Sequence, residues 1–140
     1  MFVDTNILIY STRPSSSFHG RATAALEDAA NSEPRLAISR QVVREYLAVA
    51  TRPGGQSEPL AMSDALADVA RFTRSFDILE DGPVVAEQLV RLCRTTAVAG
   101  RQVRDANIVA TMLAHGETRL LTANRRDFQR FEPRIEVVEP

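Results

Sequence analysis

Three acidic residues stand where a carboxylate is costly unless a cation meets it: Asp4, Glu45 and Asp105. Asp4 directly follows the short apolar segment 1–3, which has the pattern of a buried strand. Asp105 falls within the apolar face of a predicted helix, and Glu45 falls at the border of the apolar face of another. A buried charge needs an opposite charge, and carboxylate oxygens are preferred ligands of hard divalent cations. The pattern therefore indicates a metal-dependent hydrolase.

Each of these carboxylates also has an ordinary structural explanation. Asp4 suits the N-cap of a helix that begins at the next residue. Glu45 can be a surface residue, and Asp105 can be an acid that the helix dipole favours in a first turn. From position alone, both interpretations stay open for each residue.

A fourth polar group follows the strand predicted near residue 120. Thr122 and Asn124 offer oxygen ligands there, and Asp127 offers a further carboxylate. Because ligands of parallel α/β sheets bind outside the carboxyl ends of the strands, we expect this group to lie beside Asp4. The alternative is a capping turn that buries Phe128.

Length and composition predict one α/β domain over residues 1–140. The chain has 140 residues, of which 44% are hydrophobic and 25% charged, enough for a core and a hydrated surface. No apolar run reaches the length of about 18 residues that spans a membrane, and the first residues lack a signal-peptide pattern. Cys93 is the single cysteine, which excludes an internal disulfide and fits a reducing cytoplasm.

The overall charge gives no support to nucleic-acid binding. The formal net charge is −1 at pH 7, so the domain is not basic. All of the positive side chains are arginines, which can bind phosphate in a bidentate manner. Arginine without lysine is equally typical of a GC-rich genome.

Short apolar segments alternate with helical patterns, which favours a parallel sheet. Ser39 has the position of a helix N-cap and Gly116 that of a helix stop. We also expect a loop at 54–60, strands over 1–4, 36–38, 76–79, 119–122 and 135–138, and helices over 5–12, 18–31, 40–51, 61–75, 83–97, 104–115 and 124–131.

Two helix faces are predicted from apolar spacing. The helix over 61–75 would face the core with Met62, Leu66, Val69 and Thr73. The helix over 83–97 would do so with Val85, Leu89, Leu92 and Cys93, which makes Cys93 a core residue.

Other catalytic chemistries find little support in this sequence. Neither HExxH, GxGxxG, GxxxxGK[ST] nor GxSxG is present. His19 and His115 lack metal-ligand spacing, and His115 near a helix end suits a favourable end charge.

With these residues in place, the chain resembles the PIN-domain ribonucleases, in particular the VapC-type toxins of bacterial toxin–antitoxin pairs. The resemblance covers nearly the whole chain and rests on segments that occur in the family's order: FVDTN at 2–6, VVREY at 42–46, RDANIVA at 104–110 with HG at 115–116, and LLTAN at 120–124 with DF at 127–128. The fourth segment departs from the family, which often carries Asp where this chain has Asn124.

This resemblance implies a three-layer α/β/α sandwich around a parallel sheet of about five strands. It implies an Mg²⁺- or Mn²⁺-dependent endoribonuclease whose site contains Asp4, Glu45, Asp105 and Asn124, with Asn6, Thr122 and Asp127 as secondary candidates. The arginines next to the acidic segments are candidates for positioning phosphate: Arg44, Arg104, Arg125 and Arg126.

The resemblance also implies partners. They are an RNA substrate such as tRNA or rRNA, a VapB-like antitoxin that covers the acidic cleft and docks on helices 18–31 and 40–51, and a second copy of the chain in a homodimer. Two other functions stay open. One is a phosphohydrolase with Asp4 as nucleophile, although Asn6 stands where such enzymes commonly carry a second Asp. The other is a degraded PIN-like module that binds RNA or protein.

Overall fold

The computed structural model describes residues 1–54 and 58–140, so the loop expected at 54–60 lies partly outside the described residues. The strands are β1 (Phe2–Val3), β2 (Ala37–Ser39), β3 (Asp77–Leu79), β4 (Arg119–Leu121) and β5 (Glu136–Val138). The helices are α1 (Thr5–Ser11), α2 (His19–Ser32), α3 (Arg40–Ala50), α4 (Met62–Ser75), α5 (Pro83–Thr95), α6 (Gln102–Ala114) and α7 (Arg125–Phe128), followed by a 3₁₀ turn at Gln129–Phe131.

The strands form one parallel sheet in the order β3-β2-β1-β4-β5. Its register brings the strand ends together, because Val3 pairs with Leu121 and Leu121 pairs with Val138. The residue after β1 therefore lies beside the residue after β4. The backbone N–H of Asp4 donates to the carbonyl oxygen of Leu121 at 3.0 Å.

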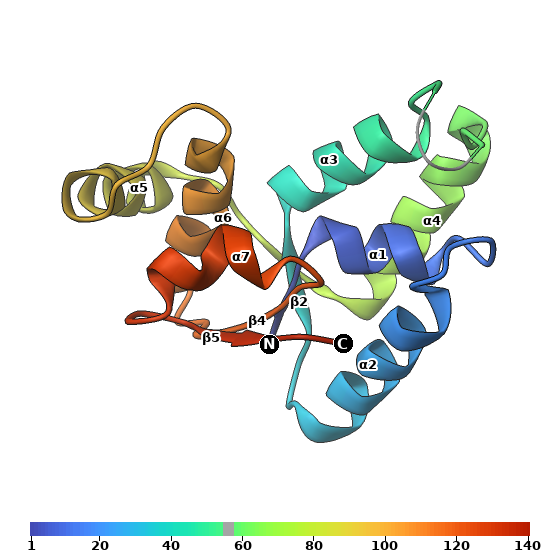
Figure 1. Ribbon diagram of the computed structural model, residues 1–140, viewed down its shortest axis with the longest axis horizontal. Helices are drawn as coiled ribbons and strands as arrows, with labels where there is room; N and C mark the ends of the chain where they lie inside the picture. Colours follow the sequence, from blue (N-terminus) through green and yellow to red (C-terminus); the bar gives the residue numbers. More distant parts are fainter. Residues whose placement is uncertain (55–57) are drawn as a thin grey trace.

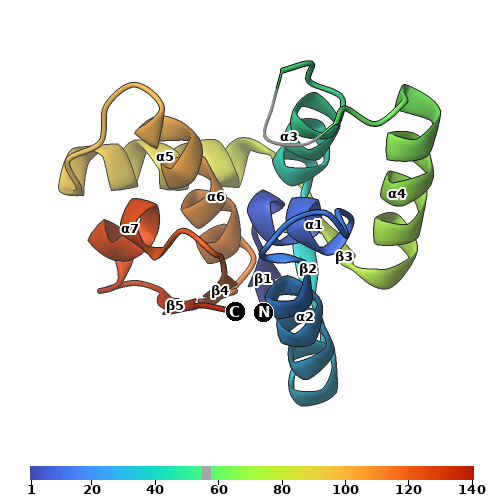
Figure 2. The same ribbon diagram turned by 45° about the vertical axis from the view of Figure 1, so that its right-hand side comes forward.

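Helices cover both faces of the sheet, which confirms the three-layer α/β/α prediction. Helices α1–α4 lie on one side of the strands and α5–α7 on the other, in both views (Figure 1, Figure 2). Right-handed crossovers require this division, since the chain first adds strands on one side of β1 and then on the other. The order reverses between β1 and β4, and such a switch point is where open α/β sheets bind ligands.

Local sequence signals account for several element boundaries. The hydroxyl of Ser39 accepts from the backbone N–H of Val42 at 3.3 Å and caps α3 as predicted. Gly116 adopts φ +73° just past α6, a conformation that glycine reaches without steric cost. The central strands β1 and β2 are fully buried, and Phe2 of β1 and Leu120 of β4 have no exposed surface.

The predicted core face of α4 was wrong apart from Val69, which packs against the core. Met62 and Leu66 are half exposed, and α4 instead buries Ala65 and Phe72. Phe72 packs edge-on against Tyr46 of α3 with ring centroids 4.9 Å apart. The true face is about one residue, or about 100°, from the predicted one, because α4 packs on α3 and leaves its outer apolar residues uncovered.

Cys93 is exposed, not buried in the core as predicted. Val85 and Leu92 supply the buried contacts of α5, and this helix packs mainly on α6. A helix with one neighbour buries only a narrow stripe, so the residue at the edge of that stripe reaches solvent. Within the described residues, none of the helices has the length and apolar character that crossing a membrane requires.

Candidate active site

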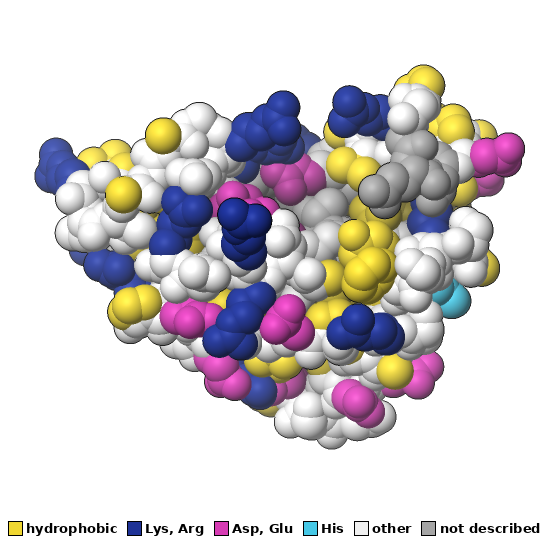
Figure 3. Space-filling view, viewed as in Figure 1, with side chains coloured by type: hydrophobic (Ala, Val, Ile, Leu, Met, Phe, Trp, Pro, Cys, Tyr) yellow, Lys and Arg dark blue, Asp and Glu magenta, His cyan; other side chains and the backbone are white. Residues whose placement is uncertain are grey.

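A cleft of about 420 Å³ opens at the carboxyl ends of β1 and β4. Acidic side chains gather at a recess in the middle of the surface, with arginines at its rim and a hydrophobic patch beside it (Figure 3). The cleft contains all four acids that the sequence singled out, and it is lined by Asp4, Thr5, Asn6, Ile9, Tyr10, Arg13, Ser16, Glu45, Val49, Arg52, Arg104, Asp105, Asn124, Asp127 and Phe128.

Asp4 is the buried centre of this site. It is the N-cap of α1, since its Oδ1 accepts from the backbone N–H of Thr5 at 2.6 Å. The N-cap interpretation of Asp4 is therefore confirmed, and its metal-binding role stays a prediction. Burial raises the pKa of Asp4 to about 6, above its usual range, even though hydrogen bonds from Thr122 and Thr5 favour the ionised form. The charges of Glu45 and Asp127 raise that pKa further.

A polar network holds Asp4 in one orientation. Its Oδ2 accepts from the Thr122 hydroxyl at 2.6 Å and from Asn6 Nδ2 at 2.7 Å. Asn6 Nδ2 also lies 3.0 Å from Thr122 Oγ1, and Asn6 Oδ1 accepts from the backbone N–H of Ala123 at 3.0 Å. Asn6 and Thr122 thus join the ends of β1 and β4, and both were secondary candidates from the sequence.

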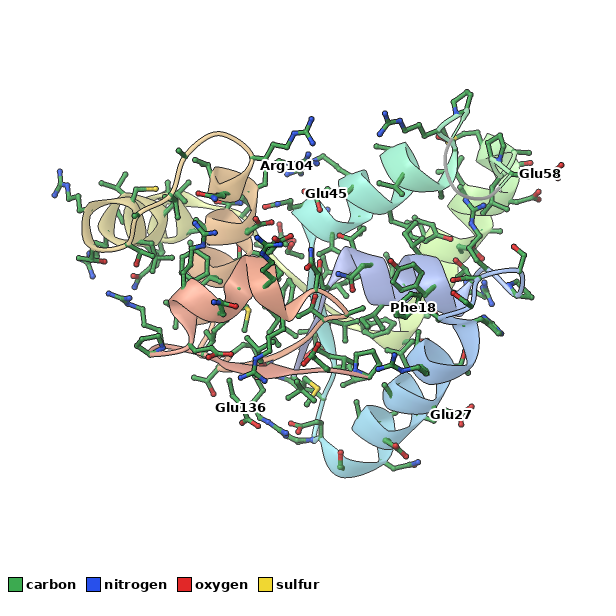
Figure 4. All side chains as sticks on the ribbon, in the orientation of Figure 1. Phe18, Glu27, Glu45, Glu58, Arg104 and Glu136 are labelled. Carbon is green, nitrogen blue, oxygen red and sulfur yellow. The ribbon has the colours of Figure 1, made fainter. Side chains whose placement is uncertain are left out.

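Glu45 projects from α3 toward α6, and its neighbours come from three elements. Its Oε2 accepts from the Thr5 hydroxyl at 3.1 Å. Its Oε1 accepts from Gln41 Nε2 at 2.9 Å and lies 3.1 Å from an Arg104 terminal nitrogen. Figure 4 shows Glu45 and Arg104 reaching toward each other across the space between α3 and α6. Asn107 of α6 completes the bridge by donating to Gln41 Oε1 at 2.7 Å.

Asp105 lies in the first turn of α6 and is partly buried in the cleft. No hydrogen bond or ion pair reaches its carboxylate from the described residues. Burial raises the pKa of Asp105 to about 6, and the charge of Asp127 adds to this effect. The charges of Asp4 and Glu45 also raise the pKa of Asp105. The acids therefore share one electrostatic field.

Asn124 and Asp127 both line the cleft, but they interact differently with the other acids of the site. Asn124 is exposed and its Nδ2 donates to Asp127 Oδ2. The charge of Asp127 acts on both Asp4 and Asp105. The structure thus places both sequence candidates at the site, with Asn124 beside Asp127.

The structure brings only one of the predicted phosphate-positioning arginines into the cleft, namely Arg104. Arg44 lies 3.9 Å from Asp81 and lines a separate groove beside α5 and α6. Arg125 pairs with Glu132 at 2.7 Å, and Arg126 is exposed outside the cleft. Neighbourhood in sequence was a poor guide, because successive helical residues point in different directions.

The cleft also contains residues that sequence reasoning missed. Tyr10 comes from the last turn of α1, Arg13 from the loop after it, and Arg52 from the end of α3. Arg13 is buried, and its guanidinium donates to the carbonyl oxygens of Ala50, at 2.6 Å, and Glu58. No motif marks these positions; only the packing of α1 against α3 places them together.

The donor set fits a hard divalent cation. Carboxylates from α3 and α6 and from the end of β1 face one cleft, and Asp105 keeps its oxygens free of protein donors among the described residues. Within those residues, no group of three or more His, Cys, Asp or Glu is gathered tightly enough to hold a metal ion by itself. Mg²⁺ does not require such a cage, because it commonly binds one or two carboxylates and keeps several waters.

This fold and this acidic switch-point cleft define a known class of protein. Residues 1–132 match the family model of the PIN domain, and the chain belongs to that family. The resemblance to the PIN-domain family that the sequence indicated is thereby confirmed.

The relatives that resemble this chain are of the VapC type. Ribonuclease VapC24 of Mycobacterium tuberculosis is 30% identical over 92% of this chain and 89% of that protein. A toxin–antitoxin complex from Klebsiella pneumoniae contains a chain with a TM-score of 0.69 and 26% identity, covering 98% of this chain and 94% of that one. VapBC2 from Rickettsia felis, solved on a promoter DNA fragment, shares the fold with a TM-score of 0.69 at 19% identity over 99% and 97% of the two chains.

Proposed function

We propose that this protein is a metal-dependent endoribonuclease of the VapC toxin type, silenced by a VapB-like antitoxin. One observation carries the proposal. Acids from separate elements, Asp4, Glu45, Asp105 and Asp127, line one cleft at the switch point of a PIN fold, and the pKa of Asp4 and that of Asp105 are raised to about 6. Related ribonucleases of known type support the choice of RNA as substrate.

Asp4 and Asp105 would hold the cation, with Glu45 as the third acid. Mg²⁺ or Mn²⁺ bound there would supply a Lewis acid for the phosphate and lower the pKa of a bound water. Asn6 and Thr122 keep Asp4 in place through hydrogen bonds of 2.7 and 2.6 Å to its Oδ2. Arg104 stands at the rim, where a guanidinium can contact a phosphate oxygen.

The fourth position is best supplied by Asp127, with Asn124 as its positioning residue. Asn124 Nδ2 donates to Asp127 Oδ2, which orients that carboxylate. The charge of Asp127 is felt at both Asp4 and Asp105. The site thus retains a fourth carboxylate although the chain carries Asn124 where the family often carries Asp.

The proposal includes partners. An antitoxin segment with a positive side chain would compete for the acidic cleft, and desolvated charge-assisted contacts of this kind are strong. Antitoxin complexes among the solved neighbours support this partner. We further propose that the protein acts in the cytoplasm as a homodimer, whose paired clefts would give RNA a longer binding rim than one near-neutral monomer.

The experiment compares Asp105→Asn with Asp64→Asn. Both acids lie in the first turn of a helix, but Asp64 is exposed on α4 and outside the cleft. With purified protein, Mg²⁺ or Mn²⁺ and total bacterial RNA, Asp105→Asn should lower the cleavage rate by at least about 100-fold, the scale of a lost charge-stabilising group. Asp64→Asn should cleave like the wild type. Cleavage that persists in excess EDTA, or in Asp105→Asn, would overturn the proposal.

A growth assay tests the toxin role separately. Expression of the wild type alone should slow bacterial growth, while Asp105→Asn should be harmless. Co-expression of the small protein encoded beside this gene should restore growth. Harmless expression of the folded, metal-binding wild type would favour the binding-module alternative instead.

The phosphohydrolase alternative is less well supported by the site. Such enzymes commonly carry a second acid two residues after the nucleophile, and this chain has Asn6 there, whose Nδ2 donates to Asp4 Oδ2 at 2.7 Å. Asn6 acts there as a donor rather than as a second acid. Release of inorganic phosphate from a phosphomonoester, abolished in Asp4→Asn, would revive that alternative.

A further inference from the structure

The cleft has two chemically different ends. The carboxylates line one part, while the last turns of α1 and α3 and the residues after them supply the other: Ile9, Tyr10, Arg13, Val49 and Arg52. We call this second part the Tyr10 end. A single cavity of about 420 Å³ joins both ends, a size within the range of roughly 300–1,000 Å³ that is typical of sites for small organic ligands.

The ring of Tyr10 is packed against a second aromatic ring. Tyr10 stacks on Phe18 with ring centroids 5.0 Å apart and planes inclined by 22°. The guanidinium of Arg21 lies 5.7 Å from the Phe18 centroid and extends this stack. Figure 4 shows Phe18 where α1 gives way to the start of α2, next to the hydrophobic patch seen in Figure 3. A ring fixed in this way loses little conformational entropy when a second flat group stacks on it.

Positive charge accompanies this aromatic surface. Among the described residues, no carboxylate lies within ion-pair distance of Arg13 or Arg52. Arg13 is buried and held by the carbonyl oxygen of Ala50, so its charge is fixed at the cleft wall. Arg52 is exposed at the rim of the cleft, where its side chain can follow the flexible backbone of a single-stranded nucleic acid. Aromatic faces with adjacent arginines are the combination that binds single-stranded nucleic acid, through base stacking and phosphate contacts.

We propose that the Tyr10 end is a nucleotide subsite that stacks one unpaired base of the RNA on Tyr10, with Arg52 on the backbone beside it. The inference rests on the proposed RNA cleavage and goes further, because it assigns a binding role to a residue outside the acidic motifs. The base would belong to a nucleotide next to the phosphate that lies at the carboxylates. A base within a duplex cannot stack there, since both its faces are covered by neighbouring bases.

The experiment measures RNA affinity rather than cleavage. A labelled single-stranded RNA hexanucleotide of mixed sequence binds to the Asp105→Asn protein with Mg²⁺, and fluorescence anisotropy gives Kd. Tyr10→Leu, which keeps apolar volume but removes the ring, should raise Kd by about ten-fold, as expected for loss of one stacked base. Tyr10→Phe keeps the ring and should bind like its parent. Circular dichroism checks that each variant is folded.

An abasic scan makes the test specific to the base. In a series of hexanucleotides, one nucleotide at a time is replaced by an abasic one. At one position this replacement should raise Kd by about ten-fold, both for the parent protein with Tyr10 and for Tyr10→Phe. With Tyr10→Leu, the same abasic RNA should bind with the Kd of the intact RNA. Removing the ring and removing the base eliminate one shared interaction, so the second removal has no further effect. Additive losses, or equal Kd for Tyr10→Leu and Tyr10→Phe, would overturn the inference.

The outcome is separable from that of the proposed function. Wild-type cleavage with unchanged affinity in Tyr10→Leu would sink the subsite alone. If Tyr10→Leu and the abasic nucleotide lower affinity non-additively but the wild type does not cleave RNA, the nuclease proposal fails and the subsite proposal stands. Weaker binding of the neighbouring small protein by Tyr10→Leu, with RNA affinity unchanged, would reassign the Tyr10 end to a protein partner and also overturn the inference.

Discussion

The two ends of the central strands β1 and β4 differ in how their acidic side chains are paired. At the amino ends of the strands, Glu117 lies 2.8 Å from Arg35 and 3.3 Å from the amine of Met1, and Glu33 pairs with Arg119. At the carboxyl ends of the outer strands β2 and β3, Arg40 pairs with Glu80 at 2.6 Å. In the cleft beyond β1 and β4, Glu45 has Arg104, but Asp4, Asp105 and Asp127 have no ion pair among the described residues. One end balances its charges within the chain, and the other leaves an excess of negative charge.

This difference separates charge used for folding from charge kept for a ligand. A paired, partly buried carboxylate stabilises the fold, and its removal leaves an uncompensated cation. Clustered carboxylates without cations oppose folding, so their presence needs another explanation, and strongly shifted pKa values gather at functional sites for this reason. The raised pKa of Asp4 and of Asp105 therefore identifies the carboxyl end as the functional one.

The largest expected effect is a pH dependence of stability that opposes ordinary acid denaturation. Asp4 and Asp105 titrate near 6 in the folded protein, against an ordinary value of 3.8. Between these values the folded state binds more protons than the unfolded state, so the free energy of unfolding falls as pH rises from about 4 to about 6. For buried Asp4 the shift corresponds to about 3 kcal/mol.

Urea denaturation of the metal-free protein at pH 4.5, 6 and 7.5 measures this effect, with Asp105→Asn as the comparison. Asp105→Asn should be more stable than the wild type at pH 7.5, and its advantage should shrink to about a third at pH 4.5. Added Mg²⁺ should raise the stability of the wild type at pH 7.5 more than that of Asp105→Asn. An Asp105→Asn protein that is less stable than the wild type at pH 7.5 would contradict the comparison of the two ends.

The amino end should respond in the opposite direction. Glu117→Gln removes the charge that faces Arg35 and the Met1 amine, and Glu117 is buried. We expect a loss of about 1–3 kcal/mol in the free energy of unfolding, the range for hydrogen bonds to charged groups. Equilibrium denaturation at pH 7.5 measures it, and RNA cleavage should be unchanged. A Glu117→Gln protein as stable as the wild type would show that the amino-end pairs are neutral.

Sequence reasoning predicted the sheet and the acids because both depend on local patterns. Asp4 follows a strand and Asp105 sits on an apolar helix face, and each fact is visible within a few residues. The Arg35–Glu117 pair joins residues 82 apart in the chain, so no local pattern indicates it. The core face of α4 was misplaced because an apolar residue contributes to the helical pattern whether it is buried or, like Met62, exposed.

The Tyr10 end stayed invisible in the sequence for a related reason. Tyr10 lies on a helix that the sequence predicted correctly, yet its proposed role depends on Phe18, which stacks on it, and on Arg52, which lines the same cleft. Neither spacing nor residue type marks such a meeting of α1, α2 and α3. The arginines show the same limit, since only Arg104 of the predicted set reaches the cleft.

A smaller effect distinguishes Asp127 from Asn124. The family resemblance favoured Asn124 as the fourth site residue and made Asp127 a secondary candidate. The geometry favours the reverse order, because the charge of Asp127 acts on Asp4 and Asp105 while Asn124 contacts Asp127. We expect Asp127→Asn to lower kcat by about ten-fold, which corresponds to about 1.4 kcal/mol, and Asn124→Ala to lower it less. A larger loss in Asn124→Ala would restore the sequence-based order.

The smallest expected effect concerns Arg104, which forms an ion pair with Glu45 in the cleft. Its nitrogens lie 3.1 and 3.2 Å from Glu45 Oε1, but the arginine side chain is largely exposed, so this pair contributes at most about 1 kcal/mol to stability. Arg104→Ala should raise KM for RNA by about 2–5-fold and reduce the salt dependence of binding by about one phosphate contact. Arg126→Ala is the matched control, because Arg126 is exposed outside the cleft and should change neither quantity. If both variants shift KM alike, phosphate is attracted by the general positive field of the surface rather than by a guanidinium at the site. If Arg104→Ala instead lowers KM, its pairing with Glu45 competes with RNA, and the acidic end is partly balanced after all.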